Sequence, residues 1–134
     1  MIVTVNARRR VGSVTDELVR KSREAALTAI QTYNNPLIQF KAETYIVLMI
    51  IAWTYLLHAY YRKNRVEYRH HRMKGARRIF DRTRSKAYKY WELERCLDCN
   101  ASPVDRDTAN NLRFLILLRH EIEHQMTTLS LIHI

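Results

Sequence analysis

The sequence has little of the residues that make tight turns. Glycine and proline occur only twice each among 134 residues. Because these two residues dominate the turns that connect short strands, their scarcity argues against a many-stranded sheet and favours long helices. The chain is long enough for one domain with a modest core and too short for two. Composition therefore predicts a single all-α domain.

Cysteine is equally scarce, with only Cys96 and Cys99. Two cysteines cannot build the disulfide framework of a small secreted domain. Their spacing is that of half a zinc site, but no second cysteine pair is present, so we interpret them as two separate thiols. The N-terminus has no secretory signal, since its run of three arginines at residues 8–10 is not followed by an apolar stretch. We therefore expect a reducing, cytoplasmic location.

Acidic residues are outnumbered, with 13 Asp and Glu against 23 Lys and Arg, which gives a net charge of +10. Such a balance predicts attraction to polyanions, with nucleic acid first and an anionic membrane surface second. The excess is concentrated in residues 62–89, where tyrosines lie between basic side chains in a pattern typical of nucleic-acid contact. The alternative is a solvated basic surface with no specific ligand. The predicted nucleic-acid-binding residues are Arg62, Lys63, Arg65, Arg69, Arg72, Lys74, Arg77 and Arg78.

The spacing of apolar residues predicts four main helices. The first should cover residues 14–33 and end before Pro36, and the second should cover residues 40–62. After a loop around residues 73–75, a third helix, in one or two pieces, should cover residues 78–97. The fourth should be capped by Ser102, with proline at its first helical position, and run to about residue 126.

The second of these helices is unusually apolar, because no Asp, Glu, Lys or Arg occurs from Thr44 to Tyr61. Such a run is close to the thickness of a bilayer core, so a membrane span is one interpretation. His58, the tyrosines of the run and the lack of a second such run favour a central helix that its neighbours bury. We therefore expect no membrane span.

Two functional patterns overlap near the end of the chain. In the first, His120, Glu121 and His124 form His-Glu-x-x-His, whose histidines would bind zinc while the glutamate acts as a base. Such a zinc hydrolase needs a third ligand, and His133 is the sole candidate among the ten residues that follow. Glu123 also places a charge where that motif normally has an uncharged residue. The zinc hypothesis is therefore the weaker one, and we expect no metal or other cofactor.

The second pattern is an arginine, a polar residue, three more residues and a histidine, formed by Arg119, His120 and His124. Arg119 interrupts an otherwise apolar helix stripe, which is costly unless the charge is paired or meets a partner. A salt bridge to Glu123 is the simpler explanation. Alternatively, two copies related by a two-fold axis would gather two arginines and two histidines around one cleft. Arginine would hold a phosphate and histidine would transfer protons as an RNA 2′-hydroxyl attacks it without a metal.

These residues carry a resemblance to the HEPN superfamily, in particular to its uncharacterised prokaryotic families. The similar segments are Lys21–Ala25, Tyr33–Pro36, Ala52-Trp53 and Asn111–His124. Nuclease members of that superfamily use an arginine, a polar residue, three more residues and a histidine, which Arg119, His120 and His124 match, with His120 as the orienting residue. One departure lies in the second helix, where similar domains often carry Glu and Lys four residues apart and this chain has Thr54 and His58.

The resemblance implies an antiparallel bundle of four main helices that forms a homodimer with a composite site. It also implies metal-independent cleavage of single-stranded RNA, often in toxin or anti-phage systems, with an antitoxin or other regulatory partner. Because some members keep the fold without activity, a module that only binds nucleic acid or nucleotides is the alternative.

The resemblance also suggests how the chain is divided. Residues 1–13 should be a flexible basic N-terminus, residues 14–128 the HEPN-like domain and residues 129–134 a non-native tail. This tail can be encoded by a sequence that resembles the transposase end used in sequencing libraries. Since HEPN-like domains usually have another helix after the motif, we expect the last helix of the natural domain to be missing and apolar core surface to be uncovered.

Overall fold

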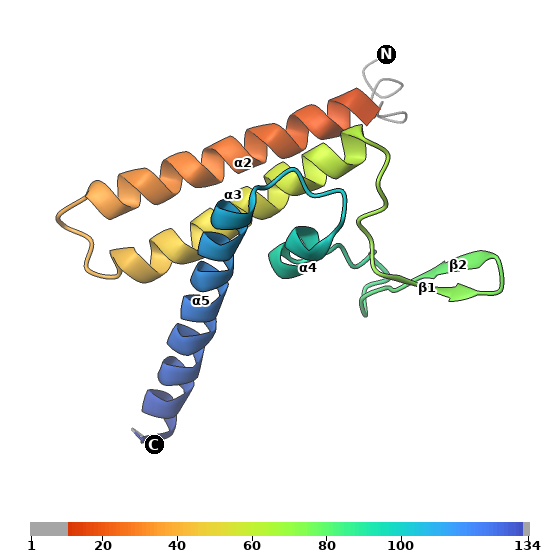
Figure 1. Ribbon diagram of the computed structural model, residues 1–134. Helices are drawn as coiled ribbons and strands as arrows, with labels where there is room; N and C mark the ends of the chain where they lie inside the picture. Colours follow the sequence, from red (N-terminus) through yellow and green to blue (C-terminus); the bar gives the residue numbers. More distant parts are fainter. Residues whose placement is uncertain (1–10, 133–134) are drawn as a thin grey trace, which may run out of the picture.

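The computed structural model describes residues 11–132, and the side chains of residues 12–125. In this range the elements follow in the order α2 (Val11–Asn34), α3 (Lys41–Lys63), β1 (His71–Lys74), β2 (Arg77–Phe80), α4 (Leu93–Asp98) and α5 (Arg106–Ile132). Figure 1 shows α2 and α3 lying side by side as a long pair, while the β1–β2 hairpin projects from one end and α5 runs steeply away. The predicted all-α class is confirmed, with one small two-stranded sheet as the addition.

The α2–α3 pair is held together by small side chains, which let two helices approach closely. Ala29, Ala52 and Ala59 are buried, and so is Ser22. The hydroxyl of Ser22 donates a hydrogen bond of 2.7 Å to the carbonyl oxygen of Ala52, which ties α2 to α3. The first two predicted helices, over residues 14–33 and 40–62, are therefore confirmed to within three residues at each end.

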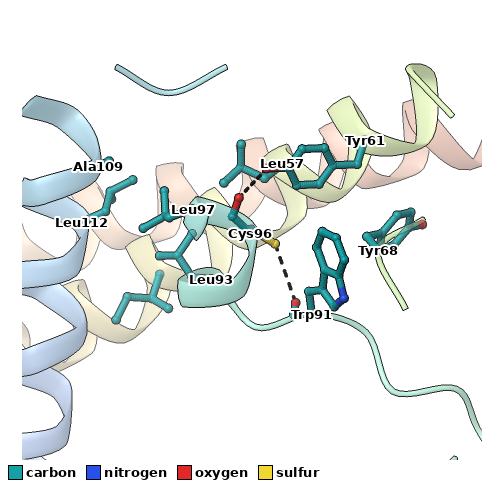
Figure 2. Close-up of a cluster of buried hydrophobic side chains, with 10 residues drawn as sticks. Leu57, Tyr61, Tyr68, Trp91, Leu93, Cys96, Leu97, Ala109 and Leu112 are labelled. Carbon is teal, nitrogen blue, oxygen red and sulfur yellow. Dashed lines mark hydrogen bonds between the residues drawn. The ribbon is translucent and has the colours of Figure 1, made fainter. Parts of the chain in front are cut away.

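The hydrophobic core lies where α3, α4 and the first turns of α5 meet (Figure 2). Leu57, Tyr61 and Cys96 are its most deeply buried large side chains. The Tyr61 hydroxyl donates a hydrogen bond to the carbonyl oxygen of Cys96, and its ring meets the edge of Trp91 with centroids 5.8 Å apart. Through these contacts, the short helix α4 holds α5 against the end of α3. The segment that leads into α4 is held there in the same way.

The two cysteines should differ sharply in reactivity. Burial raises the pKa of the Cys96 thiol to about 12, whereas the Cys99 side chain is partly exposed. Because the thiolate is the reacting form, a disulfide reagent at about pH 8 should modify Cys99 in the folded protein and leave Cys96 intact. Both thiols should react in denaturant, and Cys99→Ser should remove the reaction of the folded state. Rapid labelling of Cys96 in folded Cys99→Ser protein would contradict this expectation.

The predicted third helix over residues 78–97 is wrong for most of its length, whereas the loop expected around residues 73–75 is confirmed in part as a tight turn at Gly75 and Ala76. Strands β1 and β2 pair there as an antiparallel hairpin that turns at Gly75, whose φ of 65° suits glycine. Two isolated antiparallel β-bridges, Arg69 with Tyr90 and Arg82 with Tyr88, add backbone pairing next to the base of the hairpin. Only Leu93–Asp98 forms a helix. Residues 77–90 lack an apolar stripe at helical spacing, and aromatic and β-branched side chains favour the extended chain.

The expected start of the fourth helix is also corrected. Ser102 Oγ accepts a hydrogen bond of 3.3 Å from the amide of Val104, before the helix begins. The cap is Asp105, whose Oδ2 accepts a hydrogen bond of 3.2 Å from the amide of Thr108, and α5 begins at Arg106. This carboxylate lies three residues before the amide that it caps, as an N-cap residue should.

Among the described residues, one helix, Lys41–Lys63, is long and apolar enough to cross a membrane, with a mean hydropathy of 1.4. A core helix of a soluble protein has the same properties, so this is weak evidence for a span. Residues 1–10 of the expected basic N-terminus and residues 133–134 of the expected non-native tail lie outside the described residues. The backbone of α5 continues to Ile132.

Candidate functional site

The arginine of the overlapping motifs lies on α5 and is engaged by its own helix. Arg119 Nε donates to Glu123 Oε1 at 3.1 Å, with 40% of the Arg119 side chain and 59% of the Glu123 side chain exposed. The simpler explanation for Arg119, a salt bridge one turn along α5, is therefore confirmed. His120 and His124 are exposed. A guanidinium has five N–H donors, so the contact with Glu123 does not exhaust what Arg119 can bind.

A single chain does not bring Arg119 and His124 onto one face of α5. At about 100° per residue, side chains five positions apart point about 140° away from each other. Figure 1 shows that the C-terminal half of α5 stands away from the other helices. A site that uses both side chains on one phosphate therefore needs a second copy of this helix.

Arg119 also reaches a cavity that sequence reasoning did not anticipate. This cavity has a volume of about 600 Å³, and we call it the Arg119 cavity. Its walls come from α2, α3, the segment before α4 and α5. Three basic side chains line it, contributed by Lys21, Arg62 and Arg119. These residues lie far apart in the sequence, so the sequence alone does not group them. The one signal was that Arg119 interrupts an apolar helix stripe, which indicates a polar environment for its side chain.

Aromatic rings form one wall of the Arg119 cavity. The rings of His58 and Tyr68 are stacked, with centroids 4.7 Å apart and planes 26° apart. Tyr90 packs against Tyr68, with centroids 5.4 Å apart. Nε2 of His58 donates to the carbonyl oxygen of Trp91 at 2.7 Å. Burial lowers the pKa of His58, so this ring is neutral near pH 7.

Arg62 stands between the Arg119 cavity and a second one. The second cavity, of about 670 Å³, lies at the base of the hairpin, and Arg62, Tyr68 and Tyr90 line both. We call it the hairpin cavity. Arg62 Nε is the single buried side-chain nitrogen or oxygen in the described part of the chain that lacks a hydrogen-bond partner. An unsatisfied buried donor costs about 1–3 kcal/mol, which a ligand with an acceptor oxygen would relieve.

The eight predicted nucleic-acid-binding residues gather at the hairpin end of the molecule. Arg62 and Lys63 form the last turn of α3, and Arg65 follows that helix. The other five lie on the hairpin or just before it, at Arg69, Arg72, Lys74, Arg77 and Arg78. Lys63, Arg65 and the four side chains of the strands are exposed, whereas Arg62 and Arg69 are half-buried.

Arg69 differs from the other seven because protein groups already surround its guanidinium. Glu67 binds it with two hydrogen bonds of 2.8 and 3.0 Å. The rings of Phe80 and Tyr88 pack on it, with centroids 4.0 and 4.4 Å from Cζ. The hydrogen bonds from Arg69 lower the pKa of the Glu67 carboxyl. Arg69 therefore fixes the base of the hairpin.

The tip of the hairpin concentrates positive charge. Lys74 lies directly opposite Arg77, and Met73 lies opposite Arg78. Like charges in directly opposed positions destabilise a strand pair. A polyanion bound along the hairpin would reverse this penalty, since its phosphates would lie between the cations.

No three side chains of His, Cys, Asp or Glu come together in a geometry that could hold a metal ion, within the part of the chain that the structure describes. His133, the one candidate for a third ligand beside His120 and His124, lies outside that part.

These observations define the class of protein: a helical domain with a basic hairpin and a cavity lined by arginine side chains. The chain belongs to the DUF3644 family, described as a domain of unknown function, whose model matches residues 17–133. No curated protein and no solved structure matches the chain. The matched range includes the hairpin, the motif on α5 and every residue that lines the Arg119 cavity except Val14. The HEPN resemblance has no support from these comparisons and stays a prediction.

Proposed function

We propose that the protein is a metal-independent endoribonuclease of the HEPN type that cleaves single-stranded RNA as a homodimer. The observation that carries this proposal is the position of Arg119. The arginine of the arginine–histidine motif lines a cavity together with Lys21 and Arg62, where an RNA phosphate would meet several cations. The proposal includes a role in toxin or anti-phage systems, in which a regulatory partner such as an antitoxin restrains the activity in the cytoplasm.

The proposed chemistry divides between the two copies. Arg119 of each copy holds the scissile phosphate and stabilises the charge that develops on its oxygens. One His124 removes the proton of the RNA 2′-hydroxyl as the bond from O2′ to phosphorus forms. The bond from phosphorus to O5′ breaks, and the second His124 donates a proton to O5′. The products are a 2′,3′-cyclic phosphate and a 5′-hydroxyl, and His120 orients the neighbouring groups.

Exposed apolar side chains on α5 support the pairing of two copies. Phe114 and Leu117 are each 56% exposed. They lie three residues apart, so they share one side of the helix. At about 100° per residue, His124 lies on the same side of α5 as these two residues and Arg119 lies on the opposite side, so burying them against a second α5 would bring the two His124 side chains near each other.

The hairpin supplies the proposed RNA-binding surface. Its four exposed cations, Arg72, Lys74, Arg77 and Arg78, lie on two short strands that project from the helices (Figure 1). Contacts of this kind are made to the phosphate backbone and depend strongly on salt concentration. The hairpin would bind RNA in any sequence, while the helical part would hold the strand for cleavage.

Cleavage of an end-labelled single-stranded RNA in the presence of EDTA tests the proposal. We expect cleavage that the chelator does not reduce and fragments that end in a 2′,3′-cyclic phosphate. Cleavage that EDTA abolishes, in a protein that carries zinc, would overturn it in favour of a zinc hydrolase. A control reaction with DNA of the same sequence should give no products, because DNA lacks the attacking 2′-hydroxyl.

A second candidate is a module that binds nucleic acid without cleaving it, and the Arg119–Glu123 ion pair favours it. An arginine held by a carboxylate in its own helix is less available to a phosphate. Salt-sensitive RNA binding with no cleavage, in protein shown to be dimeric by sedimentation, would select this candidate.

A further inference from the structure

The wall shared by the two cavities combines chemistry that suits one particular kind of ligand. Tyr90 offers a ring face and is backed by the buried ring of Tyr68, and Arg62 lines both cavities beside them. Tyr90 is 49% exposed although it is packed against Tyr68, so one side of its ring is open to a ligand. Figure 2 shows Tyr68 at the right-hand edge of the core cluster, next to Trp91. A flat aromatic group can stack here without disturbing the core.

The charges around the Arg119 cavity favour an anionic group at the side of Arg62. Lys21 is already close to Glu17, at 3.8 Å, and Glu92 is close to His70, at 3.4 Å. Arg119 is paired with Glu123. Arg62 has no such carboxylate among the described residues, and its Nε lacks any hydrogen-bond partner. A phosphate oxygen is an acceptor of the kind that this guanidinium prefers.

The size of the cavity limits the ligand further. About 600 Å³ lies within the range of 300–1,000 Å³ that is usual for pockets that hold small molecules. One nucleotide fits such a volume, whereas a duplex does not. The hairpin cavity adjoins it across Arg62, Tyr68 and Tyr90 and is also lined by Arg65 and Arg78, so a chain attached to that nucleotide would meet further cations there.

We propose that the Arg119 cavity is a nucleotide pocket, in which one unstacked RNA base lies against Tyr90 while Arg62 binds the phosphate of that nucleotide. The identity of the strand as RNA rests on the proposed function. The pocket places the bound nucleotide between the cations of the hairpin and Arg119, so it selects which phosphate reaches the arginine–histidine motif. Tyr90 and Arg62 are then positioning residues and take no part in the proton transfers.

Fluorescence of Trp91 gives a direct test of this pocket. The chain has two tryptophans, so Trp53→Phe leaves Trp91, a residue of the cavity wall, as the single reporter. The probes are the four ribonucleoside 5′-monophosphates and a short RNA whose 2′-hydroxyls are methylated, which blocks cleavage. We expect saturable quenching by both kinds of probe, because a stacked base lies within contact distance of this wall.

Matched variants show whether the named residues bind the nucleotide. Tyr90→Ala and Arg62→Gln should each weaken binding at least about tenfold, and Tyr90→Phe should retain it because the ring remains. Tyr33→Ala is the control for tyrosine, since Tyr33 is also 49% exposed. Arg20→Gln is the control for arginine, since Arg20 lies on α2 outside both cavities. Thermal unfolding followed by circular dichroism checks that each variant is folded.

The outcomes separate this inference from the proposed function. Quenching that Tyr90→Ala and Arg62→Gln remove supports the pocket, even if the same protein cleaves no RNA. Cleavage of RNA with no quenching by any probe, or with Tyr90→Ala and Arg62→Gln binding as tightly as the parent, overturns the pocket and leaves the nuclease proposal intact. Equal weakening by the control variants also overturns it, because the effect would then be one of general charge or aromatic content.

Discussion

Arg119→Ala and His124→Ala should each lower the rate of RNA cleavage by about a hundredfold to ten-thousandfold. Arg119 is expected to stabilise the charge on the phosphate, and His124 to move the protons. Both side chains are partly or fully exposed, so neither substitution removes core packing, and stability should change little. The measurement is the initial rate of cleavage with enzyme in excess over a labelled RNA, which separates chemistry from product release.

The matched control for this pair is Arg106→Ala. Arg106 begins the same helix, and 89% of its side chain is exposed. The substitution removes one positive charge at a residue that does not line the Arg119 cavity, so cleavage should continue at nearly the parent rate. A cleavage rate near that of the parent in either Arg119→Ala or His124→Ala would refute the assignment of the motif. His120→Ala should have a smaller effect than either, because its role is orientation.

Neutralising the hairpin should weaken RNA binding more than any other surface change. A fourfold variant with Gln at positions 72, 74, 77 and 78 removes every cation of β1 and β2. Each lost phosphate contact lowers the slope of log K against log salt by about 0.7 for a single strand. If all four side chains bind phosphates, the slope should fall by about 3, and affinity at moderate salt should fall by more than about a hundredfold. The measurement is a set of fluorescence-anisotropy titrations at several salt concentrations.

A second fourfold variant tests whether position matters or only net charge. Changing Arg20, Arg23, Lys41 and Arg106 to Gln removes the same number of charges from the helices. In this variant, the affinity for RNA and the slope of log K against log salt should fall much less than in the hairpin variant. Equal losses in the two variants would show that the hairpin is no special surface. The hairpin variant should remain folded, since it removes the opposition of Lys74 and Arg77.

The sequence was sufficient to predict the long helices for clear physical reasons. Apolar spacing defines α2 and α3, and the turn between them contains Pro36, with Asn35 Oδ1 accepting a hydrogen bond of 3.0 Å from the amide of Leu37. The start of α5 was misplaced because Ser102 and Asp105 both have the chemistry of a cap. Only the backbone shows that the chain from Ser102 to Asp105 is not yet helical.

The hairpin and the cavity were harder to predict because their signals are not local. Gly75 is the single strong turn residue in a long charged stretch, and the pairing of Arg69 with Tyr90 spans many residues. The cavity depends on Lys21, Arg62 and Arg119, which come from three different helices. A single sequence shows that Arg119 breaks an apolar stripe, but it does not show which side chains lie across from it.

The contacts that surround the Arg69 guanidinium have a consequence for how the protein would bind RNA. Glu67, Phe80 and Tyr88 hold this guanidinium from several sides, so the base of the hairpin is already ordered in the free protein. The basic side chains of β1 and β2 therefore extend from an ordered backbone, and this backbone does not have to fold when RNA binds. Association should then avoid the large unfavourable entropy of coupled folding and binding, and the long-range attraction of opposite charges should govern its rate.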